Sequence, residues 1–298
     1  MIRKHFTNPF KKWVKQKLDY IYKENDSGNE KKINPTKLLY YPYLNNSDSY
    51  VILKEKDELE RCENDLPVPP KNLWLGYGSN SADYLYSGNE QITKMLELIN
   101  ETGFNFYKSK KILELGCSSG RMIRWLEPYS EGKEIWGTDI SSEHIYWANK
   151  YLNPPFNFAT TTTIPYLPFE DRYFDVIYAG SVFTHIDDLA ISWLLELKRI
   201  LSDKGIIYLT IHDMHSIKLL NEHNSWKDSK LTKRINSDIL FNENKDKFSV
   251  FVNGRGVDSQ VFYDLDYFCE LVKSIFKVAS VHEEAYGYQT AVLLEKIN

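Results

Sequence analysis

A glycine-bounded turn followed by an acidic residue is the strongest chemical signal in the sequence. Residues 111–126, KILELGCSSGRMIRWL, predict a short apolar strand, a turn from Gly116 to Gly120 and then a helix. Such a turn presents backbone N–H groups to a nucleotide or an anion. The next apolar segment, residues 134–139, ends in Asp139, roughly 20 positions on, where a ribose-binding carboxylate belongs. Together, the two features predict a nucleotide-like ligand.

The same turn allows two other interpretations. The letters GCSSG fit the G-x-S-x-G pattern of serine hydrolases, with Ser118 as the nucleophile. That pattern normally follows several strands, whereas little before Lys111 resembles a strand and no His-Gly-Gly stretch is present. A tight turn without any ligand is the third interpretation, but it leaves the acidic end of the second strand unexplained.

Two histidines that follow later strands are candidates for a general base. His185 comes after the strand predicted at residues 173–179, and His212 ends the strand predicted at 206–211. An unperturbed histidine titrates near neutral pH, so either side chain could accept a proton, and a structural role is the alternative for each. His212, Asp213 and His215 also resemble metal ligands, but no fourth ligand has suitable spacing, and we expect no metal.

The composition excludes some classes of protein. The chain has 298 residues and a formal net charge of -4, which gives no overall electrostatic argument for binding nucleic acid. Its 3 cysteines are too scattered for a disulfide framework or a metal knuckle. No signal peptide or run of about 18 apolar residues is present, so we expect a cytoplasmic protein.

The first 70 residues differ from the rest of the chain. Residues 1–23 predict a basic amphipathic helix, which could contact an anionic membrane surface or pack on its own domain or a partner. Residues 24–37 are polar and predict a linker, and residues 50–53 predict a short strand. Because prolines punctuate residues 67–70, we expect an N-terminal extension at 1–70 and a catalytic domain at 71–298.

Strands and helices alternate through most of the second part. A flexible loop at 73–88 should precede a helix at 91–102, and its tyrosines should either pack or face a ligand. The alternation predicts an α/β fold with a doubly wound parallel sheet. Residues 213–263 interrupt the rhythm and predict a lid or substrate-binding insertion. A helix at 265–276 and a closing hairpin with strands at 277–282 and 289–296 should end the chain.

Over residues 110–296 the chain resembles the class I S-adenosylmethionine-dependent methyltransferases. The resemblance rests on the order of four motifs, Glu114-x-Gly116-x-Ser118-x-Gly120, Asp139, Leu167-Pro-Phe with Phe174-Asp-Val, and the segment 196–205 before the fifth strand. It implies a Rossmann-like seven-stranded sheet with an antiparallel last strand, and S-adenosyl-L-methionine as the cofactor. A short-chain dehydrogenase is disfavoured, because its Tyr-x-x-x-Lys pair is matched at Tyr146 and Lys150, directly after the second strand, and at Tyr50 and Lys54, before the glycine turn.

The resemblance also implies roles for individual residues. Glu114 and the turn, including Ser118, would hold the methionine portion of the cofactor. Asp139 would bind both ribose hydroxyls, and Ile140 would pack on the adenine. Threonines near residue 160, Thr161 among them, occupy the place where the family often has an acidic residue. Gly180 and Ser181 would line the methionine side.

The same resemblance implies transfer of a methyl group to a hydroxyl or an amine of a small polar acceptor, such as a sugar or a biosynthetic intermediate. Segments 181–186, 210–213 and 288–292 resemble a bacterial-type subgroup associated with glycan and secondary-metabolite loci. No Asn/Asp-Pro-Pro-Tyr motif follows the fourth strand, so a DNA substrate is not expected. A serine hydrolase and a non-catalytic nucleotide-binding or interaction protein are the alternative functions.

Overall fold

The structure is a computed structural model that describes residues 60–61, 65–255 and 259–297. The chain separates into two units, residues 1–39 and 40–298, and every described residue belongs to the second. The predicted amphipathic helix, the linker and the strand at 50–53 lie outside the described residues. The proposed domain boundary near residue 70 therefore stays a prediction.

A seven-stranded sheet organises the described unit and confirms the predicted fold class. Its strand order is β3-β2-β1-β4-β5-β9-β8. The first five strands run parallel, and β9 runs antiparallel between β5 and β8. The strands are β1 (Lys111–Leu115), β2 (Glu134–Asp139), β3 (Asn157–Thr160), β4 (Phe174–Ala179), β5 (Leu201–Ile211), β8 (Phe276–Tyr286) and β9 (Gln289–Lys296).

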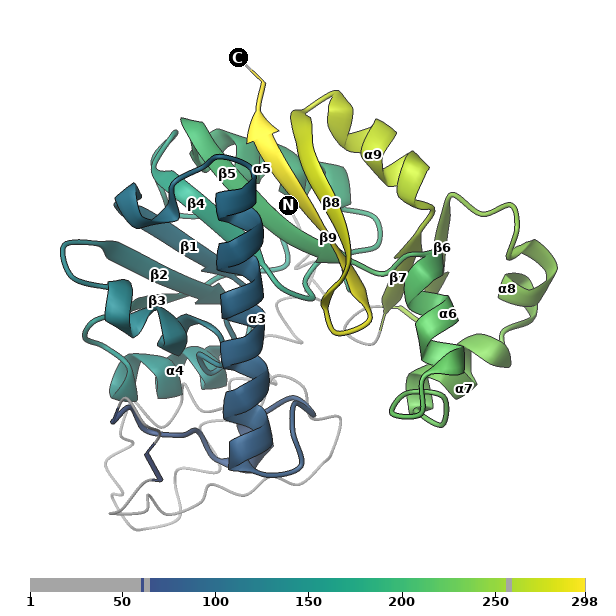
Figure 1. Cartoon of the computed structure of the whole chain (residues 1–298), viewed down its shortest axis with the longest axis horizontal. Helices are drawn as coiled ribbons and strands as arrows, with labels where there is room; N and C mark the ends of the chain where they lie inside the picture. Colours follow the sequence, from purple (N-terminus) through teal and green to yellow (C-terminus); the bar gives the residue numbers. More distant parts are fainter. Residues whose placement is uncertain (1–59, 62–64, 256–258, 298) are drawn as a thin grey trace, which may run out of the picture. The chain divides into compact units, whose positions relative to one another are not determined.

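Helices cover both faces of this sheet, because the central strands carry apolar side chains on both sides. On β4, Val176 and Tyr178 join the core beneath α3 (Ser81–Glu101), η3 (Ile123–Tyr129) and α4 (Ser142–Tyr151). The alternate residues Ile177 and Ala179 join the core beneath α5 (Ala190–Ile200) and α9 (Leu265–Lys273). Figure 1 shows α3 crossing one face of the sheet.

Two predictions about helices were wrong in detail. The helix α3 begins at Ser81, because the Asn80 side chain accepts a hydrogen bond from Asp83 N–H at 2.9 Å and caps it. Much of the predicted flexible loop is therefore helical, and Tyr84 is buried against Trp74, with ring centroids 5.1 Å apart. The predicted helix after the glycine turn is the 3-10 helix η3, which contains Pro128.

The predicted insertion folds into a small unit with its own core. It contains α6 (Met214–Glu222), α7 (Lys230–Asn236), α8 (Ile239–Asn244) and a two-stranded sheet of β6 (Val250–Asn253) and β7 (Gln260–Tyr263) (Figure 1). Its helices begin at side-chain caps on Asp213, Ser229 and Asp238. A bridge between His212 and Phe262 joins this unit to the end of β5. Two further short 3-10 helices are η1 (Lys71–Leu73) and η2 (Phe106–Lys108).

Within the described part of the chain, no helix is both long enough and apolar enough to cross a membrane.

Candidate functional site

Most of the predicted site residues lie along one edge of the sheet. Because β1 to β5 are parallel, the segments that follow them all leave the sheet at its carboxyl edge, where ligands bind in open α/β folds. These segments contain the glycine turn after β1, Asp139 and Ile140 at the end of β2, Thr161 after β3, Gly180, Ser181 and His185 after β4, and His212 after β5.

The glycine turn has the backbone geometry that its sequence predicts. Gly116 and Gly120 have φ values of 76° and 80°, a region that glycine adopts without strain. A side chain at Gly116 would lie 2.4 Å from Val182 Cγ2, and one at Gly120 would lie 2.4 Å from Leu152 Cδ1. The Leu152 side chain therefore packs directly against Gly120.

Asp139 is fixed in place by the backbone around it. Its Oδ2 accepts a hydrogen bond from Ser118 N–H and its Oδ1 accepts one from Ser141 N–H, each at 2.8 Å. Burial raises the pKa of Asp139, while these two N–H groups and the nearby His144 oppose that shift. A carboxylate oxygen can accept more than one hydrogen bond, so both oxygens can still receive the hydroxyl groups of a ribose.

These contacts argue against the serine hydrolase interpretation. Ser118 Oγ lies 3.5 Å from Nδ1 of His144, which is at the outer limit for a hydrogen bond. The hydrogen bonds that Asp139 accepts come from the backbone N–H groups of Ser118 and Ser141, and none is found from the His144 ring among the described residues. The described residues around Ser118 therefore lack the hydrogen-bonded serine, histidine and aspartate of a catalytic triad.

The other predicted cofactor residues differ in how deeply they are buried. Ile140 is exposed, and Thr161 N–H donates to the Asp139 carbonyl at 2.9 Å, so both lie beside the carboxylate. Glu114 instead points into the core from the middle of β1, where Tyr178 O–H donates to it at 3.0 Å. Burial raises the pKa of Glu114 to about 8, although Tyr178 and Arg121 oppose that shift.

Gly180 and Ser181 are tied to the closing hairpin. A side chain at Gly180 would lie 2.7 Å from the Tyr286 ring. Ser181 N–H donates to Thr210 Oγ1 at 2.7 Å, and Gln289 Nε2 donates to Ser181 Oγ at 2.8 Å. Since Thr210 also donates to Gln289 Oε1 at 2.7 Å, uncharged polar groups form a closed network at this edge.

His185 has a defined tautomer. Its Nδ1 lies 2.8 Å from the Ser259 carbonyl, which can only accept, so Nδ1 carries the hydrogen and Nε2 keeps its lone pair. Gln260 Nε2 also lies 3.3 Å from Nδ1, but the shorter contact to the carbonyl decides the tautomer. The residue keeps contact with solvent, yet the atoms packed around its ring lower its pKa through burial, and the Ser259 carbonyl opposes this.

His212 lies in a different environment, although β7 contacts both histidines. Its ring is stacked between Phe262 and Tyr288, with centroids 4.7 and 5.4 Å away, and the residue is 1% exposed. Neither ring nitrogen has a hydrogen-bond partner among the described residues. Burial lowers the pKa of His212 to about 3; nearby His185 adds to this shift and the Val261 carbonyl opposes it.

Three residues near the turn were missed or left undecided at the sequence level. The buried Arg121 guanidinium lies over the Tyr77 ring, 3.9 Å from its centroid, and donates to Gln91 Oε1 at 2.6 Å and to Tyr286 O–H. Tyr286 O–H donates to Tyr77 O–H at 3.1 Å. The position of Arg121 directly after Gly120 was a possible signal, but its partners come from α3 and β8, far away in sequence.

Two of the three residues that resembled metal ligands, Asp213 and His215, have other partners. Asp213 caps α6 and accepts a hydrogen bond from Thr290 Oγ1 at 2.6 Å. His215 Nε2 contacts Glu284 Oε1 at 2.9 Å. No group of three or more histidine, cysteine, aspartate or glutamate side chains that could hold a metal ion occurs among the described residues.

Comparison with known proteins agrees with this architecture. A family described as a methyltransferase domain matches residues 113–209, from β1 into β5. A protein from Pyrococcus horikoshii OT3 is 21% identical with a TM-score of 0.51, over 76% of this chain and 97% of that one, and shares the fold. An S-adenosylmethionine-dependent methyltransferase from Clostridium acetobutylicum is 16% identical with a TM-score of 0.49, over 70% and 92% of the two chains.

The matched segment contains the glycine turn, Asp139 and the strand that precedes Gly180 and Ser181. A hydrogen bond from Ser118 N–H to Asp139 joins the turn to the carboxylate at the end of β2, and β9 runs antiparallel beside β5. Residues 113–209 form a methyltransferase domain, and the sheet around them has the Rossmann-like fold of the class I S-adenosylmethionine-dependent methyltransferases.

Proposed function

We propose that the chain transfers a methyl group from S-adenosylmethionine to a hydroxyl, or an amine, of a small polar acceptor, and that His185 is the general base. The observation that carries this proposal is the tautomer of His185. Its Nδ1–H donates to the Ser259 carbonyl at 2.8 Å, so Nε2 is the atom that can accept a proton. His185 follows β4, next to the segment proposed to face the methionine end of the cofactor.

The cofactor lies across the ends of β1 and β2 in this proposal. Asp139 accepts hydrogen bonds from the ribose hydroxyls, while Ile140 and Thr161 lie on the adenine side. The methionine portion lies toward Glu114, the Gly116–Gly120 backbone including Ser118, and Gly180 with Ser181. The support is the position of these segments at one edge and the two N–H groups that orient the Asp139 carboxylate.

The chemistry required of the protein is positioning and removal of one proton. The bound cofactor supplies an electrophilic methyl group. The acceptor oxygen or nitrogen forms a bond to that methyl group, the carbon–sulfur bond breaks, and its electron pair stays on sulfur. The acceptor proton passes to Nε2 of His185. Burial lowers the pKa of His185, so the base is already unprotonated at neutral pH.

The groups near this edge favour an uncharged acceptor. Ser181 is half-buried and joins the buried Thr210 and Gln289 in an uncharged hydrogen-bonded network, and Tyr288 and Trp226 add half-buried aromatic rings 5.2 Å apart. Aromatic rings with hydroxyl and amide partners suit a sugar or a similar polar intermediate. This supports a small polar acceptor as the finer part of the proposal.

The test is transfer of a labelled methyl group to paired acceptors. Each pair would be a sugar or polyol and the same compound with one hydroxyl removed, incubated with labelled S-adenosylmethionine. We expect transfer to one hydroxyl compound and none to its deoxy partner. Equal labelling of both members, or labelling only of carboxylate acceptors, would contradict the proposal, while binding of S-adenosylhomocysteine without any turnover would favour a non-catalytic protein.

A further inference from the structure

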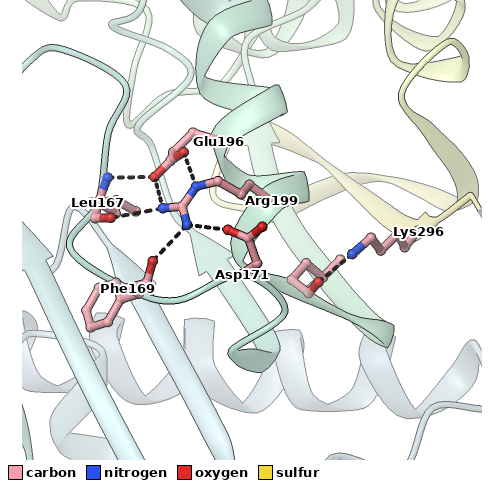
Figure 2. A network of polar contacts seen from close by, with 7 residues as sticks. Leu167, Phe169, Asp171, Glu196, Arg199 and Lys296 are labelled. Carbon is pink, nitrogen blue, oxygen red and sulfur yellow. Dashed lines mark hydrogen bonds and ion pairs between the residues drawn. The ribbon is translucent and has the colours of Figure 1, made fainter.

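The loop between β3 and β4, residues 161–173, is held to α5 by a single arginine. Arg199 Nε and Nη2 donate to the two carboxylate oxygens of Glu196 at 2.8 and 2.7 Å. Its Nη1 donates to the Phe169 carbonyl and to Asp171, both at 2.8 Å, and Nη2 donates to the Leu167 carbonyl at 3.0 Å. Figure 2 shows the guanidinium at the centre of these partners.

The carboxylate of Glu196 also binds the loop directly. It is buried, and its Oε1 also accepts Leu167 N–H at 2.6 Å, so both backbone groups of Leu167 are bonded to α5 side chains. Only a planar guanidinium can reach two carbonyls and two carboxylates at once, because lysine presents a single ammonium group. The arrangement fixes the loop by geometry as well as by charge.

The first half of the same loop is fixed at its other end. Thr161 N–H donates to the Asp139 carbonyl at 2.9 Å, directly below the carboxylate proposed to bind the ribose. Between these two fixed points, Ile164 and Tyr166 are 66% and 68% exposed. Arg199 also contacts the Tyr166 ring, with its Cζ 5.6 Å from the ring centroid, and exposed apolar side chains of this kind offer a surface that a planar base can cover.

We propose that Arg199 is a positioning residue for the adenine end of the cofactor, acting through residues 161–166. A base attached to a ribose on Asp139 extends beyond β2 toward its neighbour β3, and therefore toward this loop. Arg199 itself does not touch the cofactor. The proposal rests on the proposed cofactor position, and its test separates the two.

The test compares Arg199→Gln with Arg172→Gln. Arg172 lies on the same loop and forms an exposed ion pair with Asp203 at 3.2 Å, so it is a matched arginine outside the network. We expect Arg199→Gln to weaken binding of both S-adenosylhomocysteine and free adenosine by about tenfold or more, because each loop residue that binding must reorder costs roughly that factor. Arg172→Gln should leave both affinities unchanged.

Hydrogen exchange provides the readout that a merely structural role would not change. In the wild-type protein, S-adenosylhomocysteine should protect residues 161–166, and in Arg199→Gln that segment should exchange faster while β1 and β4 do not. Glu196→Gln, which keeps the shape of the side chain, should give the same local change if Arg199→Gln is too unstable to study. Unchanged affinity for both ligands alongside a mobile loop, or absence of ligand protection at 161–166, would overturn the proposal. Failure of the wild-type protein to bind S-adenosylhomocysteine would instead overturn the cofactor position.

Discussion

Asp139 at the end of β2 and His212 after β5 lie on the same edge of the sheet but differ in their hydrogen bonds. At the end proposed to bind the cofactor, Asp139 accepts hydrogen bonds from two backbone N–H groups. At the end beside the insertion, both nitrogens of His212 lie buried between aromatic rings without a partner among the described residues. Leaving a buried polar group unbonded costs about 1–3 kcal/mol. The carboxylate at the first end is therefore oriented by its own hydrogen bonds, whereas the second end contains a buried polar group that has none among the described residues.

The largest expected effect concerns His185, one of the two histidines beside the insertion. Replacing His185 with glutamine should lower kcat by about 100-fold or more, the typical contribution of a general base. Affinity for S-adenosylhomocysteine should stay unchanged, because His185 lies after β4, away from the ribose carboxylate. His215→Gln is the matched control, since His215 pairs with Glu284 at the surface. The rates and affinities of the three proteins are measured under the same conditions.

The pH profile sharpens this prediction. The general base must be unprotonated, so activity should fall on acidification through the pKa of His185, which burial holds below 6.5. Full activity of His185→Gln, or an unchanged acid limb in that variant, would remove His185 from the chemistry.

The next effect concerns the carboxylate at the cofactor end. Asp139→Asn should weaken S-adenosylhomocysteine binding by about 10- to 100-fold, because hydrogen bonds to a charged group contribute roughly 1.5–3 kcal/mol. Asp175→Asn is a matched control, since Asp175 Oδ2 also accepts two backbone N–H groups, at 2.7 and 3.1 Å, but at the amino end of the sheet. Calorimetric titration that gives equal affinities for both variants would contradict the assigned ribose position.

Glu114 should make the stability of the free protein depend on pH. The folded protein keeps the Glu114 proton up to a pKa of about 8, whereas the unfolded chain releases it near 4.5. The folded state therefore binds the extra proton between these values, and its stability falls as the pH rises, by at most about 1.4 kcal/mol per pH unit. Denaturant unfolding of Glu114→Gln, measured between the pKa values of about 4.5 and 8, should lack this slope. An identical slope in both proteins would show that another group causes it.

The smallest expected effect concerns the buried, unbonded ring of His212. His212→Phe removes the two unbonded nitrogens and retains a ring in the stack with Phe262 and Tyr288. The free energy of unfolding should rise by about 1–3 kcal/mol, with turnover changed less than about threefold. Tyr288→Phe keeps both rings and serves as the control. A more stable protein that has lost turnover would show that His212, and not only His185, takes part in the reaction.

The backbone geometry around the glycine turn and Asp139 was largely predictable, because its signals are local in sequence. The glycines at 116 and 120 are required by positive φ values, and Asp139 follows directly from the end of β2. The start of α3 was missed because Gly76, Gly78 and Gly88 resemble a loop, although the Asn80 and Asp83 pair is a readable cap.

The rest depended on contacts between distant residues. The tautomer of His185 is set by Ser259, and the burial of His212 by Phe262 and Tyr288, all contributed by segments that follow in the chain. Sequence patterns placed both histidines at the same edge but could not distinguish an accessible imidazole from a stacked one. The insertion was expected because the segment is long and polar. Its helices were not predicted, and the structure shows that they begin at side-chain caps on Asp213, Ser229 and Asp238.

A crystal structure of the protein with S-adenosylhomocysteine tests the central claim most directly. The account predicts that both ribose hydroxyls lie within about 3 Å of the Asp139 carboxylate oxygens, with the homocysteine portion toward the Gly116 turn. A nucleoside bound elsewhere, or a ribose that Asp139 does not contact, would contradict it.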